Sequence, residues 1–171
     1  MCQVMIEEDL LDRQFMREQT DLALLRRTDT GKFLREPDVT GSGREDQFYF
    51  WNSATSEIAA ASRSTLAFDG EQALEGRFAV ILADGNEITV EPVFEGVKRS
   101  LAADYTAEKA AAKCGLHASL IETIARKMGT KRTLTQVGWG GCKVYHSDLS
   151  ERAMLLASAL SGNWGKPGTG Q

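Results

Sequence analysis

The sequence has few cysteines and no long apolar run. Its three cysteines, Cys2, Cys114 and Cys142, are odd in number and far apart, which excludes a disulfide framework and a paired-cysteine metal motif. No stretch of about 18 consecutive apolar residues predicts a transmembrane helix. The first nine residues contain three acidic side chains and no basic one, so they do not form a secretory signal.

The composition is close to that of an average soluble globular chain. Hydrophobic residues make up 42% and charged residues 26% of the 171 residues, which excludes disorder throughout and a collagen-like chain. The length suits one domain or one piece of a larger domain.

Charge is distributed unevenly along the chain. Residues 1–100 contain 11 Lys and Arg against 19 Asp and Glu, whereas residues 101–171 contain nine against five. Eight of the 16 glycines follow residue 128. This basic, glycine-rich third is either an ordinary solvated face with loops or a surface that receives phosphate groups.

The first two thirds predict helices, an irregular stretch and a hairpin. Apolar periodicity predicts a helix over 2–20, in which Asp12 caps a second turn. Residues 21–75 are hard to assign, and residues 52–65 are small and polar without clear periodicity. The aromatic cluster at 48–51 is interpreted as pinning a loop to a core rather than as a binding platform. Alternating apolar residues around Asp84-Gly85 predict a β-hairpin over 77–94.

The last third predicts two helices, a strand, a glycine loop and a further helix. Thr106 caps a helix that ends at Gly115. The next helix presents Leu116, Leu120 and Ile124 on one face, with Ile121 and Met128 beside them, and stops at Gly129. A strand over 133–137 is followed by the loop 138–141, and Ser147 or Asp148 caps a helix to Leu160 that is buried on most sides.

The fold class is therefore α/β, helix-rich, with a β-hairpin and a strand–glycine loop–helix unit near the C-terminus. We expect a helical segment over 1–36, an irregular segment plus the hairpin over 37–100, and helices, strand and glycine loop over 101–171. A parallel strand needs neighbours, and no comparable strand precedes 133–137. This suggests that the chain is incomplete.

The glycine loop is the candidate binding site. Ligands of open α/β sheets lie beyond the carboxyl ends of the strands, and a following helix directs amides and partial positive charge to that place. Glycines allow close approach of the backbone, Lys143 adds charge, and aromatic rings can stack on a flat ligand. The candidate cofactor-binding residues are Gly138, Trp139, Gly140, Gly141, Lys143, Tyr145, His146 and Asp148.

Simpler interpretations of these residues stay open. The glycines can merely turn the chain, and His146 can be a cap or a surface residue. Asp148 is expected to cap the helix. Lys143 replaces the third glycine of a dinucleotide fingerprint, and Pro167 follows Gly165-Lys166 where a phosphate-binding loop has Ser or Thr. Catalytic residues are not identifiable, and no cluster has metal-ligand spacing.

Two stretches near the C-terminus form a recognisable pattern: the run 137–152, VGWGGCKVYHSDLSER, and the tail 159–170, ALSGNWGKPGTG. With them, residues 133–170 resemble the molybdopterin oxidoreductases of the dimethyl sulfoxide reductase family. Stretches at 11–22, 28–36 and 105–125 are similar to motifs of the same family, in the same order. The form of residues 143–148 is most similar to the branch of nitrate, selenate and chlorate reductases, ethylbenzene dehydrogenase and dimethyl sulfide dehydrogenase.

The resemblance implies part of a catalytic subunit with molybdenum held by two molybdopterin guanine dinucleotides, in which the metal carries out two-electron oxygen-atom transfer or hydroxylation. It also implies an iron–sulfur cluster in an N-terminal part and an iron–sulfur electron-transfer partner subunit. The remaining partner is the rest of the same catalytic subunit; neither nucleic acid nor direct membrane insertion is expected. The glycine loop and residues 143–146 would line the bis-pterin site.

Several parts of the family pattern do not occur in this chain. They are the N-terminal cysteine motif, the stretch that supplies the protein ligand to molybdenum, and the C-terminal pterin-binding domain. We therefore expect an inactive fragment, whose compartment is open because any twin-arginine signal would lie upstream of Met1. The alternatives are a stand-alone α/β module that binds a phosphate or nucleotide, and an interaction domain that docks through residues 40–75.

The fragment hypothesis predicts an open reading frame that continues on both sides. Sequencing the flanking DNA should reveal a cysteine motif upstream and a second glycine-rich domain downstream. A genuine start signal at Met1 together with a stop codon after Gln171 would count against this hypothesis.

Overall fold

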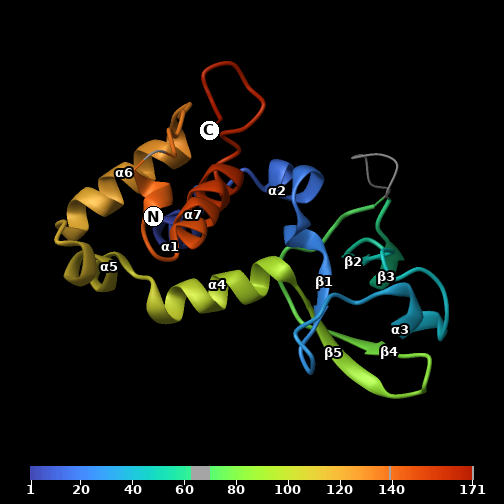
Figure 1. Ribbon diagram of the computed structural model, residues 1–171. Helices are drawn as coiled ribbons and strands as arrows, with labels where there is room; N and C mark the ends of the chain where they lie inside the picture. Colours follow the sequence, from blue (N-terminus) through green and yellow to red (C-terminus); the bar gives the residue numbers. More distant parts are fainter. Residues whose placement is uncertain (63–69, 139, 171) are drawn as a thin grey trace. The chain divides into compact units, whose positions relative to one another are not determined.

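The computed structural model describes residues 1–62, 70–138 and 140–170, and its chain divides into two compact units (Figure 1). Unit 1 comprises Met1–Met16 and Ser100–Gln171, and unit 2 comprises Arg17–Arg99. Helices dominate unit 1, whereas unit 2 contains the regular strands of the described chain.

A three-stranded antiparallel sheet forms half of unit 2. The strands are β1 (Leu25–Arg27), β4 (Phe78–Ile81) and β5 (Glu87–Pro92), in the order β1-β5-β4. The predicted hairpin over 77–94 is confirmed as β4–β5, which turns at Gly85 with φ 84°. Such a left-handed φ favours glycine because it has no Cβ.

A second hairpin lies where we expected irregular chain. Strand β2 (Tyr49–Asn52) pairs in antiparallel fashion with β3 (Glu57–Ala60), and short α3 (Glu36–Thr40) and the 3₁₀ turn η1 (Asp21–Ala23) precede it. The expectation was wrong because β3 is short and mostly small or charged; pairing with the aromatic β2 overrides its weak propensity.

The aromatic residues of β2 belong to the core, as interpreted from the sequence. Phe50 is buried, and Trp51 stacks on Phe78 with ring centroids 4.1 Å apart. Both Tyr49 and Trp51 pack against a cluster of buried aliphatic residues from the first sheet and the loop after β1: Leu25, Leu34, Val80, Leu82 and Val90.

Glu91 of β5 is a buried carboxylate shared by three arginines. Arg26, Arg77 and Arg99 approach its oxygens to 2.7, 3.1 and 2.6 Å. The hydrogen bond from Arg99 is the main reason why the pKa of Glu91 falls from 4.5 to about 2, and Arg26 and Arg77 add to the effect. A buried carboxylate is stable only when paired in this way.

The N-terminal helix is interrupted. Instead of one helix over 2–20, the chain forms α1 (Cys2–Glu7) and α2 (Arg13–Gln19), because Asp9 takes a left-handed φ of 51°. Asp12 caps the second helix as predicted, since its Oδ1 accepts the amide of Phe15 at 3.0 Å.

The helices that follow unit 2 begin and end largely as predicted. Helix α4 (Val93–Asp104) leads to α5 (Ala107–Cys114), whose cap Thr106 accepts the amide of Lys109 and whose C-terminal Gly115 has φ 72°. Helix α6 (Ala118–Thr130) continues through Gly129 instead of stopping there. Glycine is needed at that position because an added Cβ would lie 2.6 Å from Cβ of Leu10.

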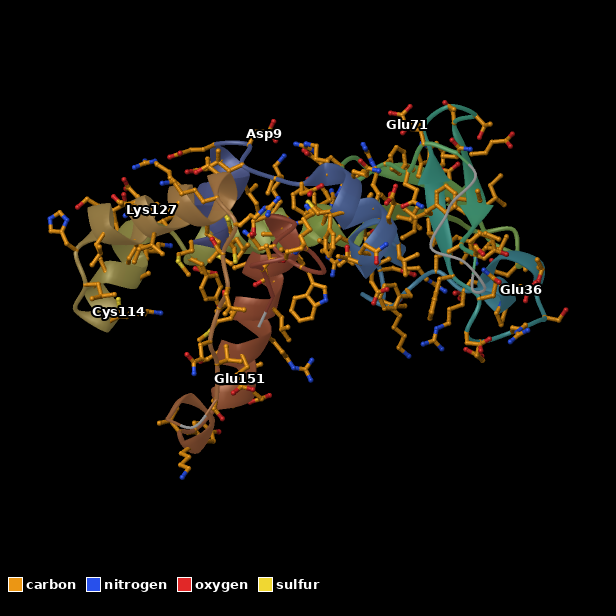
Figure 2. All side chains as sticks on the ribbon, turned by 90° about the horizontal axis from the view of Figure 1, so that it is seen from above. Asp9, Glu36, Glu71, Cys114, Lys127 and Glu151 are labelled. Atoms are coloured by element: carbon orange, nitrogen blue, oxygen red, sulfur yellow. The ribbon has the colours of Figure 1, made fainter. Side chains whose placement is uncertain are left out.

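The apolar faces of α6 and α7 (Ser147–Leu160) differ from the prediction. Ile121, Ala125 and Met128 are the buried residues of α6. Ile121 and Met128 are the residues predicted beside the apolar face, whereas Leu116, Leu120 and Ile124, which define that face, are exposed. Helix α7 is buried only near its end; Leu149, near its start, is 56% exposed. Figure 2 shows Glu151 on the part of α7 that projects from the other helices.

The predicted strand over 133–137 is not formed. Leu134 makes one isolated parallel bridge to Gly170, in which Thr135 donates its amide to the Gly170 carbonyl at 2.9 Å. A strand requires a continuous partner, and the described part of unit 1 contains no other strand to supply one. The strand–glycine loop–helix unit is thus a loop followed by a helix.

Among the described residues, no helix has both the length and the hydropathy that a membrane span requires.

Glu91→Gln tests the buried carboxylate. Loss of charge-assisted hydrogen bonds should lower the free energy of unfolding by about 1–3 kcal/mol near neutral pH, measured by urea denaturation. Because folding lowers the pKa of Glu91, its contribution is present above pH 4.5 and is lost as pH falls towards 2. The difference between wild type and variant should therefore shrink on acidification; a constant difference would contradict this account.

Candidate functional site

The segment that leads to the glycine loop is held by Asn163. This side chain is 4% exposed. Its Oδ1 accepts the amide of Thr133 at 2.9 Å, and its Nδ2 donates to the carbonyl of Met128 at 2.7 Å. One buried amide therefore joins the end of α6, the start of 133–137 and the residues after α7.

A second set of contacts fixes the tail to the N-terminal segment. The amide of Asp12 donates to the carbonyl of Leu160 at 2.8 Å, and Lys166 pairs with Asp12 at 3.0 Å. Gly162 has φ 62°, and an added Cβ there would collide with Asp12. Glycine is therefore required at 162 by both conformation and space.

The glycine loop is open on its outer side. Gly138 has φ 107°, and an added Cβ at Gly138, Gly140 or Gly141 would meet no described atom within 4 Å. Some amides of the loop are used internally: Gly141 donates to Gly138, and Lys143 donates to Gly140 across the short 3₁₀ turn η2 (Gly141–Lys143). The loop thus presents open backbone, with only part of its amides free for a ligand.

The aromatic residues before α7 are exposed. Tyr145 is 90% exposed, and its ring lies 3.8 Å from the ring of His146 between centroids. His146 is the residue that precedes α7, with a left-handed φ of 59° and no side-chain capping bond. The expected cap at Ser147 or Asp148 is therefore wrong: both lie inside the helix, because the chain enters it through the turn at His146.

The candidate residues form one exposed surface segment, which we call the 138–148 loop. Gly138, Gly140, Gly141, Lys143, Tyr145, His146 and Asp148 all lie in it or in the first turn of α7. Trp139 lies outside the described residues. The loop and the first turns of α7 contain two cationic residues, Lys143 and Arg152, and two acidic ones, Asp148 and Glu151. Their formal charges cancel, so positive potential at this place depends on the position of Lys143 and on the N-terminus of the helix.

The residues fit a flat anionic ligand on one side only. Open glycine backbone, an exposed aromatic ring and a lysine provide stacking surface and hydrogen-bond donors. The loop does not follow a strand as predicted, so no sheet edge borders the other side of the site. No group of three His, Cys, Asp or Glu side chains in the described chain is placed to hold a metal ion.

Sequence reasoning did not single out Asn163, Asp12 or Gly162 as the contacts that hold the site in place. The signal lay in the tail motif, in which glycine precedes an asparagine directly after a helix. A side-chain amide at that place can satisfy an unpaired carbonyl at a helix end, and here Asn163, which follows α7, donates to Met128 at the end of α6.

Comparison with known proteins identifies relatives over nearly the whole chain. The alpha subunit of perchlorate reductase from Dechloromonas aromatica is 39% identical over 99% of this chain and 21% of that subunit. The alpha subunit of dimethylsulfide dehydrogenase from Rhodovulum sulfidophilum is 34% identical over 98% and 19%. The alpha subunit of chlorate reductase from Ideonella dechloratans is 31% identical over 91% and 17%. No protein-family profile matches the chain.

These relatives are oxidoreductases, and they define a family of molybdenum oxidoreductase catalytic subunits. The chain belongs to this family, the dimethyl sulfoxide reductase family, and the resemblance drawn from its sequence is confirmed. The chain spans about a fifth of the length of the relatives that it matches.

Asn163→Ala tests the amide that holds the segment before the loop. Leaving the amide of Thr133 and the carbonyl of Met128 without this partner should lower the free energy of unfolding by about 1–3 kcal/mol, measured by chemical denaturation. Thr123→Ala is the control, because its exposed hydroxyl only donates to Ser119 within α6; it should change stability by less than about 0.5 kcal/mol. Equal effects of the two variants would show that Asn163 has no special role.

Proposed function

We propose that this chain is part of the catalytic subunit of a molybdenum-dependent oxidoreductase, in which the 138–148 loop forms one wall of the bis-pterin site. The observation that carries the proposal is the exposed loop itself, with open glycine backbone beside Lys143 and Tyr145, in a chain whose relatives are alpha subunits of such enzymes.

The apolar surface of unit 1 supports a role within a larger subunit. Large apolar side chains are exposed just before α6 and on it, on the 131–137 stretch, in the loop and on α7: Leu116, Leu120, Ile124, Leu134, Val144, Leu149 and Leu155. A monomeric module usually exposes little contiguous apolar surface. This abundance favours a segment covered by other protein over a stand-alone phosphate-binding module.

The residues of the loop would act by binding and orienting. The exposed ring of Tyr145 suits stacking on a fused ring, and Lys143 suits a phosphate or a ring oxygen. His146 can donate or accept a hydrogen bond according to its protonation. The bound cofactor would supply two-electron oxygen-atom transfer or hydroxylation, and an iron–sulfur cluster and an electron-transfer subunit would exchange electrons with it.

Lys143→Ala in the full-length subunit tests this proposal. Loss of one charged contact to the cofactor should reduce molybdenum and pterin content per polypeptide about tenfold under limiting cofactor supply, as a loss of about 1.4 kcal/mol implies. Metal analysis and pterin fluorescence provide the measurement.

Lys127→Ala is the matched control, since Lys127 is an exposed lysine of α6 outside the loop (Figure 2). Cofactor content that is equal in the two variants and in the wild type would contradict the proposal. Circular dichroism of both variants separates a lost contact from a loss of folding.

A further inference from the structure

The outer edge of strand β4 is an unpaired surface of unit 2. In the sheet order β1-β5-β4, β4 has a hydrogen-bonded neighbour on one side only (Figure 1). Leu82 donates its amide to the carbonyl of Asn86 across the hairpin at 2.9 Å. Because the direction of hydrogen bonding alternates along a strand, Val80 also faces β5, whereas Ala79 and Ile81 direct their backbone groups to the other side.

These outward backbone groups are free in the described part of the chain. Neither the amide nor the carbonyl of Ala79 or Ile81 has a hydrogen-bond partner there. Both residues are exposed, Ile81 to 67%. The edge is closed only at Ala83, whose amide donates to the carbonyl of Asp38 in α3 at 2.9 Å. The free edge therefore spans Ala79 to Ile81.

Strand β4 lacks the features that usually prevent an edge strand from pairing with another chain. Charged side chains, proline and bulges serve this purpose in natural sheets. The four residues of β4 are all apolar, none is proline, and their register with β5 is continuous. Backbone donors and acceptors at strand spacing are matched by another extended segment. The edge is therefore suited to accept an added strand.

Arg77, directly before β4, indicates the chemistry of such a strand. Its side chain is 59% exposed and bonds to Glu91 through Nε at 3.1 Å. The two terminal nitrogens of its guanidinium have no hydrogen-bond partner among the described residues. A guanidinium with free terminal nitrogens pairs best with a carboxylate.

The positive charge around Arg77 is not balanced by its neighbours. Glu91 is shared with Arg26 and Arg99 as well. Glu95 lies near Arg99 and accepts the amide of the residue before Arg77. Three guanidinium groups thus have two carboxylates, and one positive charge is left over.

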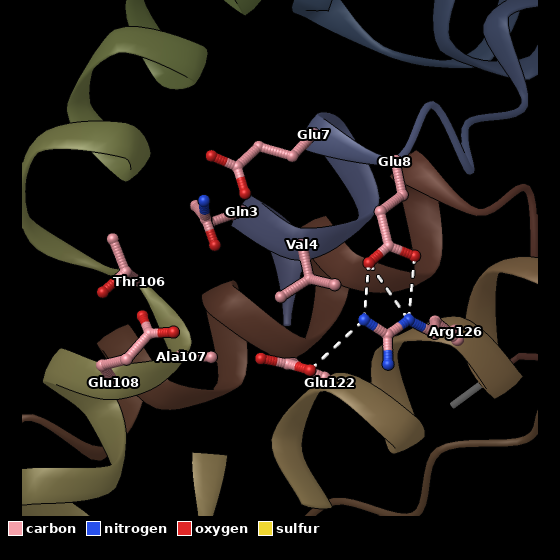
Figure 3. Close-up of a pocket in the computed structure, with 9 residues that line it drawn as sticks. All are labelled: Gln3, Val4, Glu7, Glu8, Thr106, Ala107, Glu108, Glu122 and Arg126. Atoms are coloured by element: carbon pink, nitrogen blue, oxygen red, sulfur yellow. Dashed lines mark hydrogen bonds and ion pairs between the residues drawn. The ribbon is translucent and has the colours of Figure 1, made fainter. Parts of the chain in front are cut away.

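Unit 1 shows the opposite balance. Figure 3 shows Arg126 between Glu8 and Glu122, which it contacts at 2.7 and 3.2 Å. One guanidinium there has two carboxylates, so it needs no further acidic partner. An additional carboxylate is therefore expected at Arg77 and not at Arg126.

We propose that β4 accepts an added strand from an extended polypeptide segment outside the 171 residues, with an acidic side chain that pairs with Arg77. Backbone hydrogen bonds to Ala79 and Ile81 would hold the segment, and the carboxylate would fix its register. The chain spans 21% of the alpha subunit of perchlorate reductase from Dechloromonas aromatica, so the rest of such a subunit can supply the segment. That source rests on the proposed function, whereas strand addition itself does not.

A second copy of the chain fits this edge less well. An antiparallel copy that pairs Ala79 with Ile81 would place its Arg77 opposite Ala83. Helix α3 already occupies the edge at that position through the carbonyl of Asp38. The two copies would therefore obstruct each other at both ends of the pairing.

Hydrogen exchange in the full-length subunit, resolved to single amides by mass spectrometry, tests the added strand. The amides of Ala79 and Ile81 should exchange about a hundredfold more slowly than free backbone amides. In the dilute 171-residue chain they should exchange freely, while Val80, which faces β5, stays protected. Free exchange of Ala79 and Ile81 in the full-length subunit would overturn the proposal, as would their protection in the dilute 171-residue chain.

Arg77→Ala in the full-length subunit tests the acidic partner. Loss of this ion pair should raise the exchange rates of Ala79 and Ile81 about tenfold relative to that of Val80. The ratio to Val80 is the readout, because loosening of the whole hairpin raises all three rates together.

Arg99→Ala is the matched control, since it also removes hydrogen bonds to Glu91 but lies on α4. It should leave the ratio unchanged. Equal effects of the two variants, or no effect of Arg77→Ala, would overturn the acidic partner.

The source of the strand is distinguished with the isolated full-length subunit. Protection that persists on dilution supports a segment of the same polypeptide. Protection that is lost on dilution would assign the edge to a second copy, and protection that requires the electron-transfer subunit would assign it to that partner; either result would overturn the assignment. None of these outcomes depends on molybdenum content, so this proposal and the proposed function can fail separately.

Discussion

The side-chain amide of Asn163 is the constraint on which the arrangement of unit 1 depends. It bonds to the end of α6 and to the start of the 133–137 stretch, which no sheet holds in place. Asp12 fixes the same region from the N-terminal side through Leu160 and Lys166. The chain that leads into the 138–148 loop is therefore attached at Thr133 and Thr135, and helix α7, which follows the loop, is attached at its far end through Leu160.

This arrangement explains why a site can be open in this chain. The base of unit 1 is satisfied internally, whereas the loop, the start of α7 and one face of α6 present apolar and aromatic side chains outward. Such surfaces gain free energy when another protein layer or a large ligand covers them.

Much of the fold could be predicted because local chemistry determined it. The β4–β5 hairpin follows from its alternation and from Asp84-Gly85, and the caps at Asp12 and Thr106 follow from their residue types. The strand at 133–137 could not be predicted correctly, because its residues suit a strand but only a tertiary partner decides whether one forms. Likewise, periodicity located the apolar faces of α6 without showing which one the rest of unit 1 covers.

The role of the 138–148 loop in holding a cofactor stays a prediction. Its described residues from Gly140 to Asp148 are mostly exposed, yet no strand leads into the loop, and the cap falls on His146 instead of Ser147 or Asp148. The buried contact through Asn163 was missed because single-sequence patterns do not reveal which backbone groups a side chain will meet.

The most direct measurement is a structure of the full-length subunit purified with its cofactor. The account predicts that Lys143 or a backbone amide of the 138–148 loop lies within hydrogen-bond distance of a pterin cofactor. It also predicts that the ring of Tyr145 contacts that cofactor. A structure in which this loop is covered only by protein, with no cofactor atom in contact, would contradict the account.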